Sequence, residues 1–156
     1  MHHLQPWKKG ECAISAIGIQ AQLIDTATPL LNHLDKVIFD TILDKAGCGC
    51  KRDCDCNIYY QKETGDFILR KCGSYLVNWT VAVEGSSLVP QISFALQVRD
   101  EIFGAVTLPV SVGLVSGSSL IVLRYLNTKV SLVNNSEDIV RLADVTPISN
   151  LVITKI

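Results

Sequence analysis

The sequence predicts an all-β domain, a sandwich or barrel built from short antiparallel strands. Turn-forming residues interrupt the chain roughly every eight to twelve residues, as is typical of such folds. Within residues 73–79, large apolar side chains alternate with smaller or polar ones. Because successive side chains in a strand point to opposite sides, Tyr75, Val77 and Trp79 are expected on one face. Residues 91–99 alternate in the same way and predict a second half-buried strand.

The expected strands follow one another with short turns between them. In chain order they are residues 12–24, 36–43, 58–61, 66–71, 73–84, 91–99, 102–110, 118–125, 129–133, 139–143 and 151–156. A helix over residues 29–44 competes with the second strand, since Leu30, Leu34 and Ile38 recur at nearly helical spacing. The third and fourth strands flank a hairpin turn in which Gly65 is free to take a positive φ. Residues 118–125 form an almost continuous apolar run, which predicts a strand buried on both faces.

Length and composition indicate one domain with part of its surface covered. The chain has 156 residues, of which 48% are hydrophobic and 19% charged, with a net charge of −1. We expect residues 1–11 to form a mobile leader and residues 12–156 a single domain, large enough to bury roughly 70% of its unfolded surface. The low charge argues against nucleic acid as a partner. No stretch reaches the ~18 apolar residues of a membrane span, and no secretory signal peptide is recognised.

Six cysteines are the second informative feature of the chain. A polar, cysteine-rich loop is expected over residues 44–57, and the cross-link candidates are Cys12, Cys48, Cys50, Cys54, Cys56 and Cys72. Three interpretations stay open: disulfides, a tetrahedral zinc site of the four loop thiolates, and reduced thiols without a fixed partner. Neighbouring Cys-x-Cys residues bridge one another only with strain. Disulfide partners elsewhere, including on other chains, are therefore favoured.

A spaced frame of residues resembles the signature of the globular-head family of complement proteins, relatives of the tumour necrosis factor (TNF) trimers. The matching positions are Asp55, Tyr60, Phe67, Gly73, Tyr75, Val77 and Trp79. One position departs, because the family expects Phe where this chain has Gly49, and Phe39 is a candidate for that core position. The resemblance implies a ten-strand, TNF-like jelly-roll sandwich that forms a homotrimer. It also implies that the matching aromatic residues, together with Gly73, Val77 and Tyr125, lie in the core or the trimer interface.

Further phrases look like the heads of collagen-like spore-surface (exosporium) proteins of Gram-positive spore formers. They are residues 73–79, 92–96, 113–123 and 132–134. This resemblance implies a self-assembling structural protein of a spore surface layer or appendage, made in the mother cell without a signal peptide. Its partners would be copies of itself and other spore-surface proteins. Disulfides from the cysteine-rich loop would then cross-link the assembly.

The sequence does not favour an enzyme. It contains no serine elbow, Gly-rich phosphate loop or His-containing metal motif, and two of its three histidines lie in the leader. No cofactor is expected, with zinc on the loop cysteines as the alternative; Asp53 and Asp55 are a further candidate pair for Ca²⁺. Two other functions stay open: a trimeric head that binds a ligand or receptor through its loops, and a thiolate metal-binding protein.

Overall fold

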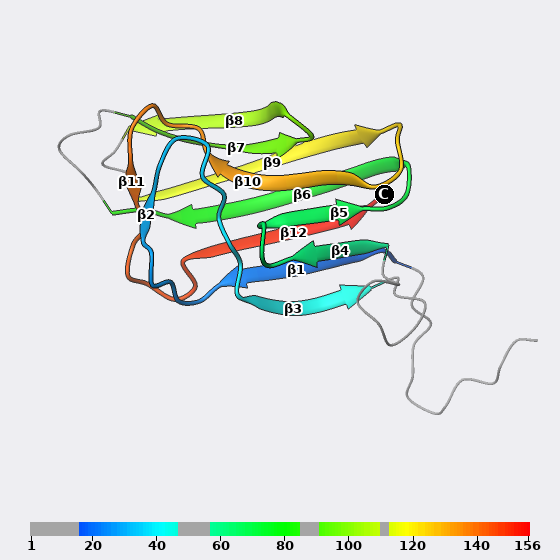
Figure 1. Cartoon of the computed structure of the whole chain (residues 1–156), viewed down its shortest axis with the longest axis horizontal. Helices are drawn as coiled ribbons and strands as arrows, with labels where there is room; N and C mark the ends of the chain where they lie inside the picture. Colours follow the sequence, from blue (N-terminus) through cyan, green and yellow to red (C-terminus); the bar gives the residue numbers. More distant parts are fainter. Residues whose placement is uncertain (1–15, 47–56, 85–90, 110–112) are drawn as a thin grey trace, which may run out of the picture.

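Two five-stranded antiparallel sheets stack face to face in the computed structural model, which describes residues 16–46, 57–84, 91–109 and 113–156 (Figure 1). The first, here called the β6 sheet, contains in spatial order β3 (Thr41–Ala46), β1 (Gly18–Leu23), β12 (Ser149–Lys155), β6 (Gly73–Ala82) and β9 (Leu114–Leu123). The second, the β7 sheet, contains β4 (Ile58–Gln61), β5 (Asp66–Leu69), β10 (Thr128–Asn134), β7 (Gln91–Val98) and β8 (Glu101–Pro109). A small pair, β2 (Leu30–Leu31) with β11 (Val140–Arg141), lies at one end.

The chain passes repeatedly from one sheet to the other. The connections β5–β6, β6–β7 and β9–β10 each change sheets, whereas β4–β5 and β7–β8 are hairpins within the β7 sheet. This arrangement confirms the predicted ten-strand jelly-roll sandwich, to which the β2–β11 pair is an addition. Alternation along the strands supplies the core, because the inward residues of both sheets meet between them.

The core is built around aromatic side chains. Phe39 is fully buried, and its ring lies 5.7 Å from that of Phe67 and 6.1 Å from that of Tyr60, between ring centroids. The Tyr60 hydroxyl accepts a hydrogen bond of 2.7 Å from the Phe39 amide. Phe39 thus fills the core position for which the sequence offered it as a candidate. Tyr75, Val77 and Trp79 are buried together, as their alternation predicted.

The β4–β5 hairpin forms as expected. The amides of Thr64 and Gly65 both donate to the carbonyl of Gln61, at 3.3 and 2.8 Å. Gly65 has a φ of 78°, and a Cβ at this position would press on the Ile38 side chain. Glycine is therefore required twice, by the backbone conformation and by the close approach of residues 36–38.

The segment after β1 differs from both of its sequence-based alternatives. Residues 36–40 are extended without forming a strand, apart from a single bridge between Lys36 and Val133, and the described residues contain no helix. The strand begins only at Thr41 and continues to Ala46, inside the loop predicted for residues 44–57. The reason is the capping role of Asp40, whose carboxylate accepts the amides of Ile24 (2.9 Å) and Asp25 (3.1 Å). Burial works to raise the pKa of the Asp40 carboxyl, but these N–H groups outweigh it and hold that pKa below its usual value.

Strand β9 corrects the prediction of a strand buried on both faces. Ile121 and Leu123 point into the core, but Leu120 and Val122 are 57% and 58% exposed. The apolar residues of this run therefore belong to two different surfaces, the inner core and the outward face of the sheet. Tyr125, expected in the core or interface, lies beyond the end of β9 and is exposed, with the Arg99 guanidinium 4.0 Å above its ring.

Candidate self-association face

The outward face of the β6 sheet carries no charged side chain on four adjacent strands, β1, β12, β6 and β9. We call this surface the uncharged face. Alternation and register place on it Gly18, Gln20, Gln22, Asn150, Val152, Thr154, Ser74, Leu76, Asn78, Thr80, Leu114, Ser116, Ser118, Leu120 and Val122. The solvent-facing side of an antiparallel sheet is normally polar. Most residues of this face are polar as well, but none of them is charged.

An apolar group occupies one side of the uncharged face. Leu76 on β6 is paired in register with Leu120 on β9, and Val122 lies opposite the neighbouring Ser74. The side chains of Leu76, Leu120 and Val122 are 37%, 57% and 58% exposed. Three neighbouring exposed aliphatic side chains are the kind of contiguous patch that marks an interaction site.

The polar residues of the face are already partly satisfied by one another. The Asn150 side-chain carbonyl accepts hydrogen bonds from the side-chain amides of Gln20 (2.9 Å) and Gln22 (3.1 Å). Beside them, a shallow groove of about 210 Å³ runs over Gly18, where a Cβ would stand 3.0 Å from the Ile153 carbonyl oxygen. Covering this part of the surface would therefore bury polar groups that already have partners.

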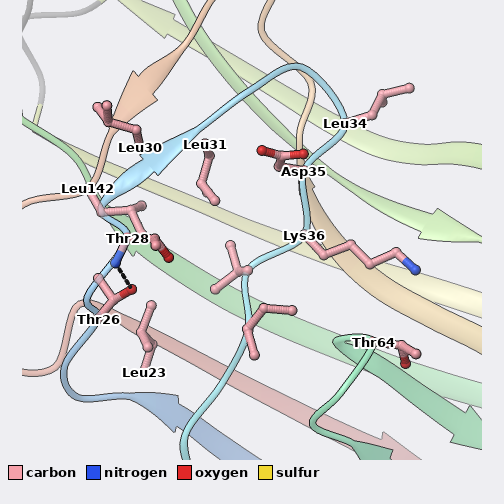
Figure 2. A pocket seen from close by; sticks show the side chains of 12 residues that line it. Leu23, Thr26, Thr28, Leu30, Leu31, Leu34, Asp35, Lys36, Thr64 and Leu142 are labelled. Carbon is pink, nitrogen blue, oxygen red and sulfur yellow. Dashed lines mark hydrogen bonds between the residues drawn. The ribbon is translucent and has the colours of Figure 1, made fainter.

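A separate, leucine-lined hollow of about 520 Å³ lies at the segment between β1 and β3 (Figure 2). Its apolar lining includes Leu23, Leu30, Leu31, Leu34 and Leu142. Leu34 has a φ of 65° and a side chain 41% exposed, both of which are unfavourable for a leucine. The ammonium of Lys36 at the rim is engaged by the Asp66 carboxylate at 2.7 Å. The hollow thus combines leucine side chains with polar residues that include Asp35 and Lys36.

A buried polar cluster ties the β10–β11 connection to β7. Asn134 is fully buried, and its side-chain amide nitrogen donates to the Leu31 carbonyl at 2.8 Å. Its side-chain oxygen Oδ1 accepts a hydrogen bond from the Ser136 backbone amide. The Ser136 hydroxyl in turn accepts the Ser93 amide at 2.8 Å, and His33 Nδ1 lies 2.8 Å from the Ser136 carbonyl. Every one of these contacts is internal, so the cluster fixes a loop. No group of three metal-ligating side chains occurs within the described ranges.

Two tyrosines of the predicted frame have altered acidity. Burial, assisted by the nearby carboxylates of Asp40 and Asp66, raises the pKa of Tyr60 to about 12 against the opposing effect of the Phe39 amide. Burial also raises the pKa of Tyr75, whose hydroxyl donates to the Lys71 carbonyl at 2.7 Å. Both phenols therefore stay neutral hydrogen-bonding groups of the core.

The structure places the predicted site residues in two groups. Phe67, Tyr75, Val77 and Trp79 are buried in the core and Tyr60 is half-buried, so none of them reaches the uncharged face. Gly73 begins β6 with a φ of 144° and lies against the Lys155 side chain. The residues that sequence reasoning missed are the outward ones, Leu76, Leu120 and Val122. These residues alternate with the buried ones along the same strands, so the pattern that predicted the core also indicates that they face outward.

Of the cysteines, only Cys72 lies within the described residues, and it is exposed in the β5–β6 connection. Cys12, Cys48, Cys50, Cys54 and Cys56 lie outside them, as do Asp53 and Asp55. The disulfide, zinc and calcium interpretations therefore stay predictions. The described part of the chain also contains no helix of sufficient length and hydropathy to cross a bilayer.

Comparison with known proteins identifies the fold. The sequence matches no protein-family model and no curated protein. Among solved structures, the globular domain of zebrafish complement 1qA protein is similar, with 15% identity, a TM-score of 0.56 and coverage of 90% of this chain and 95% of that one. The chain has a TNF-like fold. Murine APRIL (11% identity, TM-score 0.63, 91% and 100% coverage) and the Eiger TNF of S. frugiperda (14%, 0.59, 90% and 92%) are also similar.

The TNF-like fold bears out the resemblance drawn from the spaced frame. In this fold the frame residues Phe67, Tyr75 and Trp79 are buried in the core. The uncharged face is, by contrast, a property of this chain's own outward residues.

Proposed function

We propose that the chain is a non-enzymatic structural protein that assembles as a homotrimer through the uncharged face. Disulfides from its cysteine-rich segment would then cross-link the trimers within a spore surface layer or appendage. The TNF-like fold supports a trimeric head, and the resemblance of residues 73–79, 92–96, 113–123 and 132–134 to spore-surface heads supports the location.

The observation that carries the trimer is the absence of charge on four adjacent strands. Burying a charged side chain without a partner is costly, whereas burying Leu76, Leu120 and Val122 is favourable by about 25 cal/mol for each Å² of apolar surface covered. The outward hydroxyl and amide groups can form hydrogen bonds with the neighbouring copies in a trimer. A face of this composition therefore suits permanent association better than exposure to water.

The position of the cysteine-bearing segments supports cross-linking between particles. Residues 47–56 leave from Ala46 and return at Asn57, and Cys72 lies beside Gly73. Ala46 pairs with Gly18, and Gly18 pairs with Thr154, so these attachment points belong to one end of the sandwich. Of the cysteines, Cys72 is exposed at this end, where its thiol is accessible to another particle.

The deciding experiment is the particle mass by light scattering, measured on one sample with and without reductant. We expect a trimer under reduction and larger, reductant-sensitive species without it. A monomer under reduction would reject the trimer. A trimer of unchanged mass in both conditions would reject disulfide cross-linking, and zinc analysis of protein purified without chelator would then test the thiolate metal site.

The leucine-lined hollow favours a second function, a trimeric head that binds a ligand or receptor. Leu34 is held exposed in a left-handed conformation at the rim of the hollow, a combination that a binding surface would explain (Figure 2). In this case the trimer would never polymerise, and saturable binding would be lost on replacing Leu34 with Asp. The self-assembling function is preferred because residues 73–79, 92–96, 113–123 and 132–134 resemble spore-surface heads.

A further inference from the structure

The two ends of the sandwich carry opposite charge. The antiparallel strands run along the long axis of the molecule, so most connections gather at one end or the other, and the short β4–β5 turn lies between the two ends (Figure 1). We call the end where the chain terminates at Ile156 the basic end, and the end that holds β2 and β11 the acidic end. Charges that are scattered along the sequence are thereby sorted in space.

The basic end is rich in lysine and arginine. The β5–β6, β7–β8 and β9–β10 connections and the adjoining strand residues contribute Arg70, Lys71, Arg99, Arg124, Lys129 and Lys155. Against these six cations stand Asp100, Glu101 and the terminal carboxylate of Ile156. No ion pair joins any of the six to a carboxylate of the described residues.

The acidic end is rich in aspartate and glutamate. Seven exposed carboxylates gather there, those of Asp25, Asp35, Asp40, Glu84, Glu137, Asp138 and Asp144. Lys36 is paired internally with Asp66. The other cation in the described connections at this end is Arg141, whose Nε lies 3.6 Å from the Glu84 carboxylate.

Each end also exposes apolar side chains within its charged rim. Tyr125, Leu126 and Ile156 are 61%, 66% and 72% exposed at the basic end. Ile139 and Val145 are 52% and 48% exposed at the acidic end. Apolar centres with charged surroundings are the usual composition of a specific protein interface.

From this charge complementarity we propose that the protein stacks end to end, the basic end of one copy docking on the acidic end of the next. The occupant of each end is thus a second copy of this chain. A contact between two different surfaces of one molecule does not close on itself, so repeated stacking produces a rod. The inference rests on the proposed self-assembly and adds that the assembly grows end to end. The uncharged face runs along the side of the sandwich and leaves both ends open for stacking.

The test is the salt dependence of particle mass in the presence of reductant, which excludes disulfide cross-links. Charge attraction extends about 30 Å at 0.01 M salt and about 3 Å at 1 M. We expect one particle mass at 1 M salt. At 0.01 M salt the masses should be several-fold larger and whole multiples of that mass, and electron microscopy should show rods. A mass that does not change with salt would overturn the stacking.

Charge-reversal variants assign the effect to the ends. Lys71→Glu combined with Arg124→Glu removes the positive balance of the basic end, and we expect it to abolish the growth at low salt. Glu137→Lys combined with Asp138→Lys removes two carboxylates from the acidic end and should also weaken the growth at low salt. The matched control is Lys62→Glu, an exposed lysine in the β4–β5 turn, away from the basic end. If Lys62→Glu reduced the growth as much as Lys71→Glu combined with Arg124→Glu, the assignment to the ends would be rejected.

The same measurement separates this inference from the trimer. The mass at 1 M salt reports side-by-side association alone, because stacking is screened there. A trimer at both salt concentrations would reject stacking and keep the trimer. A monomer at 1 M salt that grows at 0.01 M would reject the trimer and keep the stacking.

Discussion

The indole ring of Trp79 occupies the space in which a side chain on Gly117 would begin. The two residues are paired in register on β6 and β9 and both face the core. A Cβ built on Gly117 would stand 2.6 Å from Trp79 Cε2 and 2.9 Å from Nε1. Among the described residues, the largest buried side chain thus lies directly beneath the strand that carries Leu120 and Val122. Packing in the core depends on this contact.

Gly117→Ala should lower the free energy of unfolding by about 1 to 3 kcal/mol, because the added methyl group forces the Trp79 ring out of its position. Urea unfolding monitored by tryptophan fluorescence measures the change. Ser118→Ala, one residue further along β9 and pointing outward, should stay within about 0.5 kcal/mol. Equal effects of the two substitutions would contradict the contact.

Leu76→Glu combined with Leu120→Glu should convert the trimer to monomer. The two residues are opposite one another on the uncharged face, and each introduced carboxylate would be buried without a partner, at a cost of about 3 kcal/mol. Sedimentation velocity with reductant gives the mass. Ile68→Glu, on β5 of the other sheet, is the control and should leave the trimer intact. Dissociation by Ile68→Glu as well would mean that the uncharged face is not the interface.

Stability should fall at high pH because of Tyr60. Its pKa is about 12 in the folded protein and 10.0 in the unfolded chain, and the protonated phenol is the neutral form. The contribution is therefore fully present below pH 10 and is lost as the pH rises through 12, since the unfolded chain gives up its proton first. Urea unfolding over this interval should show a smaller decline for Tyr60→Phe. Some decline should remain, because the pKa of Tyr75 is raised as well. Identical declines in the two proteins would argue against a buried Tyr60 phenol.

Two ion pairs should differ in their contribution to stability. The Asp66 carboxylate is 6% exposed and lies 2.7 Å from the Lys36 ammonium. Lys36→Met leaves this buried charge without its cation and should cost about 3 kcal/mol or more. Arg141→Ala breaks the exposed 3.6 Å contact with Glu84 and should cost less than about 1 kcal/mol. Thermal unfolding of the two variants in the same buffer compares them, and a larger loss in Arg141→Ala would refute the ranking.

Local patterns predicted much of the fold. The alternation of Tyr75, Val77 and Trp79 placed them on one buried face because the period of a strand is a local property. The turn at Gly65 was recognisable for the same reason, since its positive φ depends on a few neighbouring residues. The prediction that this strand begins at residue 36 was wrong, because the start of β3 depends on the contact of the Asp40 carboxylate with the amides that follow β1.

The sequence by itself determined the all-β class, most strand positions and the TNF-like resemblance, because these depend on periodicity and on core residues that repeat within short segments. Only the tertiary structure decided which half of each alternation faces outward, and so that Leu76 and Leu120 meet on a surface without charge. It also decided that carboxylates as distant in the chain as Asp25 and Asp144 share one end of the sandwich. Both features arise from the pairing of strands far apart in sequence, which no local pattern encodes.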